Sequence, residues 1–580
     1  MDEDGYSPLS AEIQIKVDKM KKILLALSLL IFLNFFTYPV YAEDKSYVTI
    51  VHPIRGRDIW QDISFLDEQI DTVASYNLPA TWLLQYKVLE DKEVIDRIKK
   101  LFVNHEIGIF LEVDESLADD SFVPYLYGDG DWARSDKVLL SGYLPLERER
   151  MIDQVFNKFY SVFGFYPVSV GAWYIDTFSL NYLVEKYKIQ AVLEVADQYQ
   201  TDTYGLWGKP WGVPYYPAEF NSLVPGTGNN KLNVVKIQWA ARDPIRGYGL
   251  GIADSTYSVQ ANDYAGHHGL NISYFEGLAN DYLFSKNPLT QMTVGIEVGQ
   301  EGAKYKKDYR EQIKYLYTLQ NDQKVTVLTM RDFSRVFKTE FPDSSPDYFI
   351  SGQDVYDSNT AAFWYSTNFY RIGLIKEKNI LKIRDLRLYD GNTFYIDTFE
   401  KDTNHKLQRI VPAVVDELLT HNSKVLIEGI KKEQIERDKE GVIMNIVDDK
   451  DTSHVLRLAQ RKVILDGKTI LEITDKATIK EKLRNRLANL LLSYQLILDH
   501  KWRGGVRFSY INRIYYLGLW LTPSKLLGIK TTWPFVGIFD FSYQVLARFK
   551  AIERPDYFKL VTKYFVNHLN HSTIKAVLTL

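Results

Sequence analysis

The sequence predicts an α/β protein, with a (β/α)7-8 barrel followed by a mostly antiparallel β-sandwich region that carries a few helices. Between about residues 47 and 329, short apolar segments alternate with helical patterns, as in a parallel sheet. Nearly every apolar segment there ends in a charged or hydrogen-bonding residue, which is expected where barrel strands converge on one functional face. After about residue 345, repeated short strands with turn signals replace the helical rhythm and favour a sandwich.

Eight segments of the first region fit buried strands. They span residues 48–51, 80–84, 107–111, 169–173, 191–195, 234–237, 293–296 and 325–328, and they lead to His52, Gln85, Glu112, Asp176, Asp197, Gln238, Glu297 and Thr329. Because the carboxyl ends of barrel strands share one face, we expect these polar side chains to gather at one mouth.

Helices and long loops connect these strands. Apolar residues recur at helical spacing in 94–102, 151–162, 177–187 and 305–319. Three longer connections, 114–145, 197–230 and 240–269, follow strand ends and are predicted to lie over the barrel mouth. Long ordered loops in such places are usually lids or binding loops.

The chain divides into three predicted regions. At 580 residues it is too long for one ordinary domain. Residues 1–42 are predicted to be a signal peptide with an upstream extension, 43–345 the barrel and 346–580 the β-sandwich-rich C-terminal region. The proline- and serine-containing stretch 341–346 reads as the linker between the last two.

The N-terminus has the pattern of an export signal. A basic start at 19–22 precedes an apolar run at 23–36 and a small-residue cleavage site that ends at Ala42. The run is shorter than the roughly 20 residues of a membrane span, which favours a signal peptide over an anchor. We therefore predict an exported protein, extracellular or associated with the cell envelope, cleaved after Ala42. The alternatives are translation from Met20 and membrane attachment through an uncleaved signal.

Composition limits the class of partner. A formal net charge of -4, without a dense basic stripe, argues against nucleic-acid binding driven by phosphate neutralisation. The chain has no Cys, so disulfides and cysteine-ligated metals are excluded. Aromatic residues make up 14% of the chain, which suits both sugar platforms and packed cores, and cores are the commoner use.

Three motifs, in this order along the chain, resemble glycoside hydrolase family fifty-seven, within the glycoside hydrolase/deacetylase superfamily. Val51-His52-Pro53 is similar to the motif that opens those barrels, and 171–176 is similar to the stretch that carries the family's nucleophile. The strand 293–297 is similar to the one that carries its general acid. The family normally has Glu and Asp at these two carboxylate positions, and this chain has Asp176 and Glu297.

Polysaccharide deacetylases are the second resemblance. Their metal site needs an Asp pair after the first strand and two spaced histidines, whereas this chain has His52-Pro53-Ile54-Arg55 and a single His105. A catalytic divalent metal usually needs three protein ligands. We therefore expect neither a metal nor another cofactor.

Three carboxylates are candidates for catalysis. Asp176 is the candidate nucleophile and Glu297 the candidate acid/base of a retaining glycosidase, which needs two carboxylates about 5 to 5.5 Å apart. Asp243 is the alternative acid. The competing structural interpretations are an N-cap of the helix beginning at residue 177 for Asp176, an ion pair on the rim for Glu297 and a turn with a local salt bridge for Asp243.

The candidate substrate-binding residues combine aromatic platforms with polar groups: His52, Trp173, Trp207, Trp211, Tyr215, Arg242 and Asp263. Several lie in a loop rich in Gly, Pro and aromatic residues, which can present rings to a sugar or pack on itself as an ordered lid.

These observations together predict an exported carbohydrate-active protein. Its expected activity is metal-independent glycoside hydrolysis of a polysaccharide or envelope glycan through two carboxylates. The alternatives are a catalytically inactive barrel that binds or scaffolds glycans and a divergent polysaccharide deacetylase.

Overall fold

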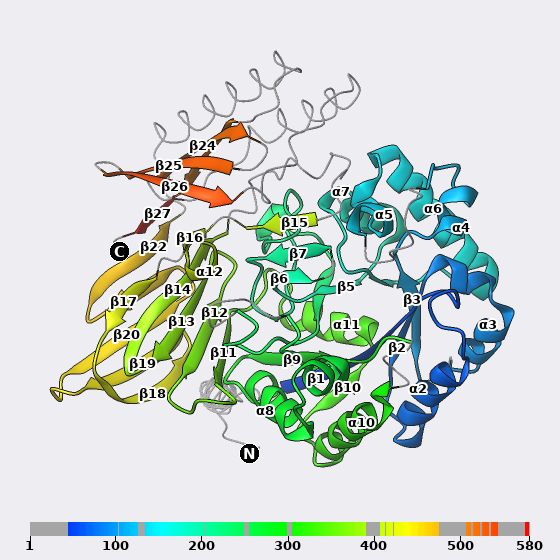
Figure 1. Cartoon of the computed structure of the whole chain (residues 1–580), viewed down its shortest axis with the longest axis horizontal. Coiled ribbons are helices and arrows are strands. Elements are labelled where there is room, and N and C mark those ends of the chain that lie inside the picture. Colours follow the sequence, from blue (N-terminus) through cyan, green and yellow to red (C-terminus); the bar gives the residue numbers. More distant parts are fainter. Residues whose placement is uncertain are drawn as a thin grey trace, which may run out of the picture. The chain divides into compact units, whose positions relative to one another are not determined.

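A computed structural model describes most of the chain (Figure 1). The described residues are 45–101, 104–125, 134–201, 203–248, 255–298, 304–389, 407–411, 413–420, 423–474, 506–511, 514–522, 525–532, 535–542 and 575–578. The chain separates into the units Met1–Lys45 and Ser46–Leu580, and only Lys45 of the first unit is described. The predicted signal peptide therefore lies outside the described residues.

The first half of the larger unit is a nearly closed parallel barrel, which confirms the predicted fold class. Its hydrogen-bonded order is β10-β1-β2-β3-β4-β5-β8, and β9 also pairs with β1. The strands are β1 (Lys45–Ile54), β2 (Thr81–Leu84), β3 (Glu106–Phe110), β4 (Ser169–Gly171), β5 (Ala191–Val195), β8 (Val235–Trp239), β9 (Leu289–Val294) and β10 (Thr326–Leu328). The barrel strands are buried because helices cover the outside of the barrel and side chains fill its inside; Val48, Ile109 and Ile237 have no exposed surface.

Helices form an outer layer around the strands (Figure 1). The longer ones are α2 (Ser64–Ser75), α3 (Lys92–Ile98), α6 (Pro145–Phe163), α7 (Thr177–Tyr187), α8 (Ile272–Leu283), α10 (Lys306–Asn321) and α11 (Met330–Glu340). Shorter ones are η1 (Tyr86–Glu90), η2 (Lys99–Leu101), α4 (Glu115–Asp120), α5 (Ser135–Val138), η3 (Leu140–Gly142), η4 (Gly228–Asn230) and the π-helix η5 (Asn262–His267). The apolar face of α6, with Met151, Val155 and Phe159, packs into the core, and the helix ends at Gly164 in the left-handed conformation.

The second half contains the predicted β-sandwich. One antiparallel sheet comprises β11 (Tyr348–Gln353), β12 (Ala361–Ser366), β13 (Tyr370–Glu377), β14 (Ile380–Leu388), β16 (Ala413–Asp416) and β17 (Lys424–Ile427). The other comprises β18 (Ile430–Asp438), β19 (Gly441–Asp448), β20 (Ser453–Ala459), β21 (Lys462–Leu465), β22 (Lys468–Thr474) and β27 (Lys575–Leu578). Side chains of both sheets, among them Ile372 and Met444, share one apolar core.

Further elements complete the described chain. The helix α12 (Glu417–Thr420) follows β16, and β23 (Val506–Ile511), β24 (Ile514–Thr522), β25 (Lys525–Thr532) and β26 (Phe535–Ser542) form a separate four-stranded antiparallel sheet. No helix among the described residues is long and apolar enough to cross a membrane. The predicted boundary at residue 345 stays a prediction, because residues 46–580 form one compact unit.

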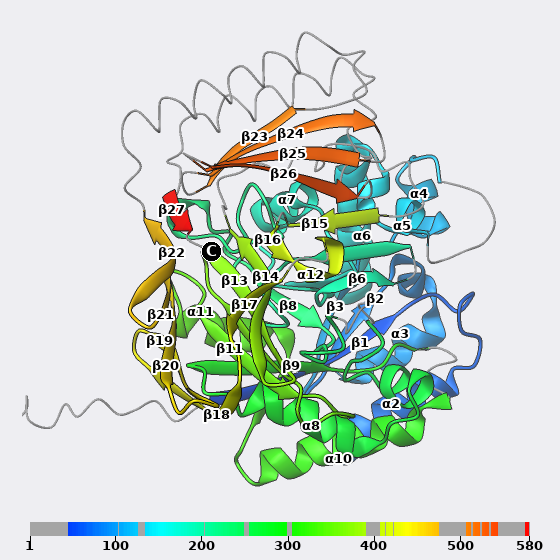
Figure 2. The same ribbon diagram turned by 60° about the vertical axis from the view of Figure 1, so that its left-hand side comes forward.

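A small sheet joins the two halves of this unit (Figure 1 and Figure 2). It has the order β15-β7-β6, in which β6 (Gln198–Thr201) and β7 (Tyr204–Trp207) belong to the long connection after β5. The third strand, β15 (Leu407–Ile410), comes from the C-terminal half and pairs with β7 in parallel register. The C-terminal half thereby supports the backbone of an insertion that follows a barrel strand.

Candidate active site

A pocket of about 690 Å³ opens where the barrel strands end. Every strand from β1 to β5, together with β8 and β9, contributes at or just after its C-terminal end, including Arg55, Gln85, Glu112, Trp173, Val195, Trp239 and Glu297. The connections add Asp58, Asp114, Tyr125, Lys137, Gln198, Tyr204, Arg242, Gln260, Asn262, Asp263 and His267. The sequence-based expectation that distant strand ends supply one mouth therefore describes this pocket.

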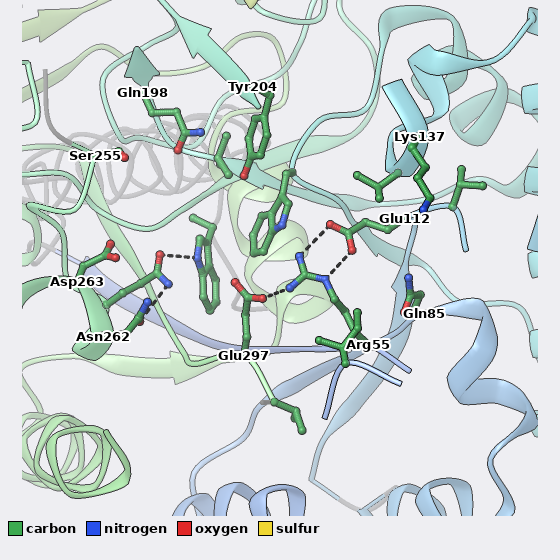
Figure 3. Close-up of a pocket in the computed structure, with 18 of the residues that line it drawn as sticks. Arg55, Gln85, Glu112, Lys137, Gln198, Tyr204, Ser255, Asn262, Asp263 and Glu297 are labelled. Carbon is green, nitrogen blue, oxygen red and sulfur yellow. Dashed lines mark hydrogen bonds and ion pairs between the residues drawn. The ribbon is translucent and has the colours of Figure 1, made fainter. Parts of the chain in front are cut away.

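Arg55 links two carboxylates at the floor of the pocket (Figure 3). Its Nε and Nη2 donate to the carboxylate of Glu112 at 2.6 and 2.9 Å, and its Nη1 donates to Glu297. The Glu297 side chain is 19% exposed, whereas those of Arg55 and Glu112 are 6% and 3% exposed. Glu297 is therefore the carboxylate of this trio that is most accessible from the cavity.

The strand arrangement explains why these three residues meet. Arg55 directly follows β1, Glu112 follows β3 by two residues, and Glu297 follows β9, which pairs with β1. Gly295 permits the close approach beside β1, because a Cβ there would lie 1.8 Å from the backbone oxygen of Val51. Rings of Phe110 and Trp173 lie 5.5 Å from the Arg55 guanidinium carbon.

The charge of Arg55 is strongly stabilised. Burial alone lowers the pKa of Arg55, but the Glu112 and Glu297 carboxylates more than offset this effect and raise it above its ordinary value. Sequence reasoning missed Arg55 as a site residue, since its partners lie 57 and 242 positions away. The available signal was a cation at the end of the first strand of a barrel whose other strands end in carboxylates.

Asp114 is a further carboxyl group of the pocket, and it was not among the three catalytic candidates chosen from the sequence. It lines the pocket and caps α4, with Oδ1 accepting the N–H of Leu117 at 2.8 Å and Oδ2 accepting the N–H of Lys87 at 3.0 Å. Burial raises the pKa of Asp114 from 3.8 to about 6, although both backbone N–H groups oppose the shift. Asp114 thus gains a proton more readily than an ordinary aspartate.

Asp176, the predicted nucleophile, lies outside the pocket lining. Its carboxylate has no exposed surface and forms a 2.8 Å ion pair with Arg148, which is equally buried. It also caps α7, accepting the N–H and the hydroxyl of Ser179 at 3.0 and 2.7 Å. The geometry therefore argues against the nucleophile and for the N-cap interpretation, because a sealed carboxylate has no route to a substrate in this conformation.

Asp243 and His52 also lie outside the pocket lining. Asp243 accepts the N–H groups of Ile245 and Arg246 and the hydroxyl of Tyr274, so it closes a local turn. His52 stacks on Trp82 with ring centroids 4.3 Å apart and contacts the Tyr309 hydroxyl at 3.0 Å. Burial lowers the pKa of His52 to about 3, and both ring nitrogens contact protein groups, the Ile296 carbonyl and the Tyr309 hydroxyl, so the side chain is structural.

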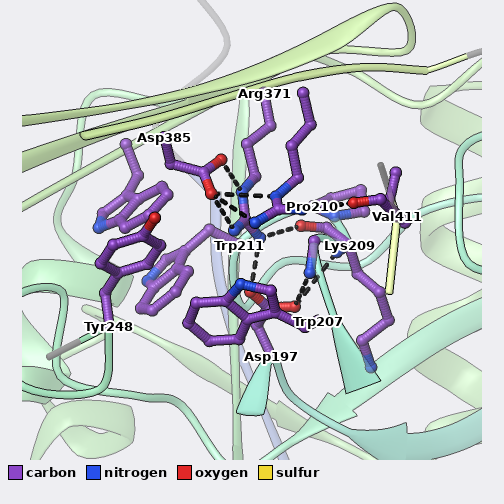
Figure 4. Close-up of polar contacts among 12 residues, drawn as sticks. Asp197, Trp207, Lys209, Pro210, Trp211, Tyr248, Arg371, Asp385 and Val411 are labelled. Atoms are coloured by element: carbon purple, nitrogen blue, oxygen red, sulfur yellow. Dashed lines mark hydrogen bonds and ion pairs between the residues drawn. The ribbon is translucent and has the colours of Figure 1, made fainter. Parts of the chain in front are cut away.

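Three predicted sugar platforms are buried, and Figure 4 shows two of them, Trp207 and Trp211, beside Arg371 and Asp385 of the C-terminal sheet. Trp211 stacks on Trp364 with ring centroids 4.1 Å apart, and Trp207 donates to Asp416 at 3.3 Å. Tyr215 donates its hydroxyl to the Ser222 carbonyl at 3.0 Å. All three platform candidates are at most 1% exposed and absent from the pocket lining, so the loop is an ordered lid packed on itself and on β12.

Four of the predicted site residues do meet at the pocket. Trp173, Arg242, Asp263 and Glu297 all line it. Arg242 donates to the Ser255 carbonyl and, at 2.8 Å, to the Gln198 side-chain oxygen, and its nearest ion-pair distance to Asp263 is 3.6 Å. Glu297 forms an ion pair with Arg55, as the competing structural interpretation expected, but both residues line the pocket.

The described residues contain no cluster of three or more His, Asp or Glu side chains arranged to hold a metal ion. The donor set at the pocket floor is instead two carboxylates already bound to one guanidinium.

Comparisons with known proteins identify no family for this chain. No protein-family model matches it, and no curated protein matches it. Among solved structures, a protein of Parabacteroides distasonis named as a glycoside hydrolase/deacetylase has 17% identity and a TM-score of 0.49, over 65% of this chain and 91% of that one. A Mycobacterium smegmatis protein named as a polysaccharide deacetylase has 12% identity and a TM-score of 0.31, over 53% and 94% of the two chains.

A peptidoglycan deacetylase of Bacillus subtilis has 12% identity and a TM-score of 0.25, over 51% of this chain and 93% of its own. None of these three structures carries a family fifty-seven name, so that finer resemblance rests on the sequence motifs alone.

Proposed function

We propose that the chain is an exported carbohydrate-active protein whose barrel mouth binds a saccharide unit of a polysaccharide or envelope glycan. The observation that carries this proposal is the composition of the pocket lining, in which carboxylates, amides and cations alternate with the rings of Trp173, Trp239, Tyr125 and Tyr204. Planar polar groups hydrogen-bond sugar hydroxyls, while aromatic surfaces cover the apolar face of the ring.

Hydrolysis of a glycosidic bond is the reaction we assign to this pocket. Arg55 holds Glu297 by a charge-assisted hydrogen bond that favours the ionised carboxylate, which suits a nucleophile or a base. Asp114, with its pKa raised by burial to about 6, suits the acid that protonates the leaving oxygen. The roles thus differ from those expected from the sequence, where Glu297 was the acid and Asp176 the nucleophile.

A specific observation favours a second candidate, glycan binding without turnover. Both oxygens of Asp114 accept backbone N–H groups, and protonation of either oxygen weakens one of these hydrogen bonds. If Asp114 serves only as the cap of α4, it supplies no proton to a leaving group, and the two glutamates of the pocket floor are both held by Arg55.

Two matched variants separate the candidates. The secreted protein and its Glu297→Gln and Asp114→Asn variants are incubated with a panel of bacterial and plant polysaccharides, and new reducing ends are measured. Both substitutions preserve shape, and Asn remains a good N-cap. Asp119→Asn, on the exposed side of α4, is the control.

Hydrolysis requires turnover that is lost in both variants and kept in the control. Saccharide affinity without new reducing ends supports the binding candidate. The absence of both turnover and affinity for every glycan of the panel would overturn the proposed function.

Export has its own test. N-terminal sequencing of protein recovered from the medium or the envelope should find Glu43 as the first residue. A mature chain that still begins at Met1 or Met20 would contradict cleavage after Ala42.

A further inference from the structure

Two hydrogen-bond donors in the pocket wall lack partners among the described residues. Arg242 and Gln198 both line the cavity and are 4% and 1% exposed. The Gln198 oxygen accepts from Arg242 Nη2, which leaves the Gln198 Nε2 amide without an acceptor, and Arg242 Nε also has none. Unpaired buried donors are costly, and a ligand that enters the pocket can supply the missing acceptors.

The two arginines of the pocket differ in how their charge is balanced. The guanidinium nitrogens of Arg55 lie 2.6 and 2.9 Å from the two carboxylate oxygens of Glu112, and Arg55 also contacts Glu297. Arg242 has its nearest carboxylate, that of Asp263, at 3.6 Å. Burial lowers the pKa of Arg242 below its ordinary value, because the surrounding charges offset its desolvation only in part.

The partners of Arg242 differ from those of the floor trio. Arg242 donates to the Ser255 carbonyl and the Gln198 oxygen, whereas Arg55 pairs with the Glu112 and Glu297 carboxylates. In Figure 3, Gln198 and Ser255, to which Arg242 donates, lie across the view from Glu112 and Lys137.

We propose that the Arg242–Gln198 wall binds an anionic substituent of the sugar, a carboxylate or a sulfate, and that the substrate is therefore an acidic glycan. This inference rests on the proposed saccharide function and goes beyond it by naming the substrate class. The acceptor oxygens of the substituent pair with Arg242 Nε and Gln198 Nε2. Because both nitrogens are covered in this conformation, small rotations of the two side chains accompany binding.

The test compares matched ligands on the full secreted protein by titration calorimetry. The ligands are an oligosaccharide that contains glucuronic acid, the same oligosaccharide with its carboxyl groups reduced to alcohols, and a sulfated form of the reduced one. Affinities are measured for the unmodified protein, for Arg242→Gln and Gln198→Met, and for Arg335→Gln, whose side chain on α11 is 59% exposed and serves as the control.

We expect an acidic ligand to bind about tenfold or more tightly than the neutral one, in line with a hydrogen bond to a charged group. This preference should disappear in Arg242→Gln, shrink in Gln198→Met and persist in Arg335→Gln. The uronate and sulfate arms identify the anion. If Arg242→Gln does not fold, the preference of the unmodified protein and its reduction in Gln198→Met carry the test.

The failures are distinguishable. Equal affinity for acidic and neutral ligands overturns the acidic-glycan inference and leaves the saccharide function standing. An acidic preference that survives Arg242→Gln overturns the assignment to this wall. Absence of binding to every saccharide overturns both proposals.

Discussion

The pocket and the junction of the barrel with the C-terminal sheet each place a buried arginine between two carboxylates, but the pocket group lines a cavity and the junction group is sealed. In the pocket, Arg55 joins Glu112 to Glu297. At the junction of the barrel and the C-terminal sheet, Arg371 joins Asp197 to Asp385 at 2.6 and 2.9 Å (Figure 4). The chemistry of the two groups is the same, but their accessibility differs, because Glu297 is 19% exposed and the junction side chains are at most 1% exposed.

The carboxylates of the junction group also bind further protein groups. Asp385 and Asp416 also bind Arg387, and Asp197 accepts the N–H groups of Gly208 and Lys209. Such a sealed network fixes one arrangement of its elements and leaves no room for a ligand. The comparison shows that accessibility, and not the kind of charged group, distinguishes the two arginine triads.

The first prediction concerns the junction and has the largest effect on stability. Arg371→Met leaves Asp197 and Asp385 buried without their shared cation, which should lower the free energy of unfolding by about 3–5 kcal/mol. Chemical denaturation followed by tryptophan fluorescence measures the change. A loss of unfolding free energy no larger than that from removing an exposed ion pair would show that the junction is not sealed.

The second prediction concerns the pocket. Glu297→Gln should reduce glycan turnover by about 10²–10⁴-fold, as for a lost catalytic carboxylate. The melting temperature should change little, because Gln keeps a hydrogen-bonding oxygen toward Arg55. A large fall in melting temperature would place Glu297 in the same structural class as Asp385.

The third prediction uses the raised pKa of Asp114. Since its pKa is about 6 in the folded chain and 3.8 in the unfolded one, folding takes up a proton between these values, and the free energy of unfolding falls as pH rises through this window. Asp114→Asn lacks that contribution, so unfolding measured from pH 4 to 7 should show the variant gaining stability relative to the unmodified protein. Parallel pH curves would contradict the shift.

If Asp114 is the acid, turnover by the unmodified protein should also decline above about pH 6, where this carboxyl group loses its proton. A turnover rate that stays constant from pH 5 to 8 would leave Asp114 with the cap role alone.

The fourth prediction has the smallest effect. Lys431 and Asp451 form an ion pair in the second sheet, with side chains 48% and 82% exposed. Lys431→Met should leave the melting temperature essentially unchanged, because water screens such a pair. If Lys431→Met destabilised the protein as much as Arg371→Met, burial would not explain why some ion pairs stabilise this fold and others do not.

The barrel and the sandwich followed from the sequence because their signals are local and repeated. Glu112 and Glu297 follow strands that the alternation of strand and helix patterns predicts, and the parallel arrangement of these strands brings both residues to one face. The pairing of β15 with β7 had no local signal, since the two segments lie far apart in sequence and neither pattern identifies its partner.

The site followed only in part. Asp176 precedes a helix, and a capping aspartate and a catalytic one look alike until Arg148 is seen to seal it. Trp207 and Trp211 lie in a loop whose composition suits both display and packing, and the C-terminal sheet that covers them is remote in sequence. Arg55 escaped notice because only the folded barrel brings its two partners to it.

The most direct test of the central claim is hydrogen–deuterium exchange with and without the tightest-binding oligosaccharide of the glycan panel. The account predicts ligand-dependent protection in the segments that line the pocket, around residues 55–59, 112–114, 239–242 and 297–298. Protection confined to the junction, around residues 207–216 and 364–387, with none at the pocket, would contradict the assignment of the open arginine triad as the binding site.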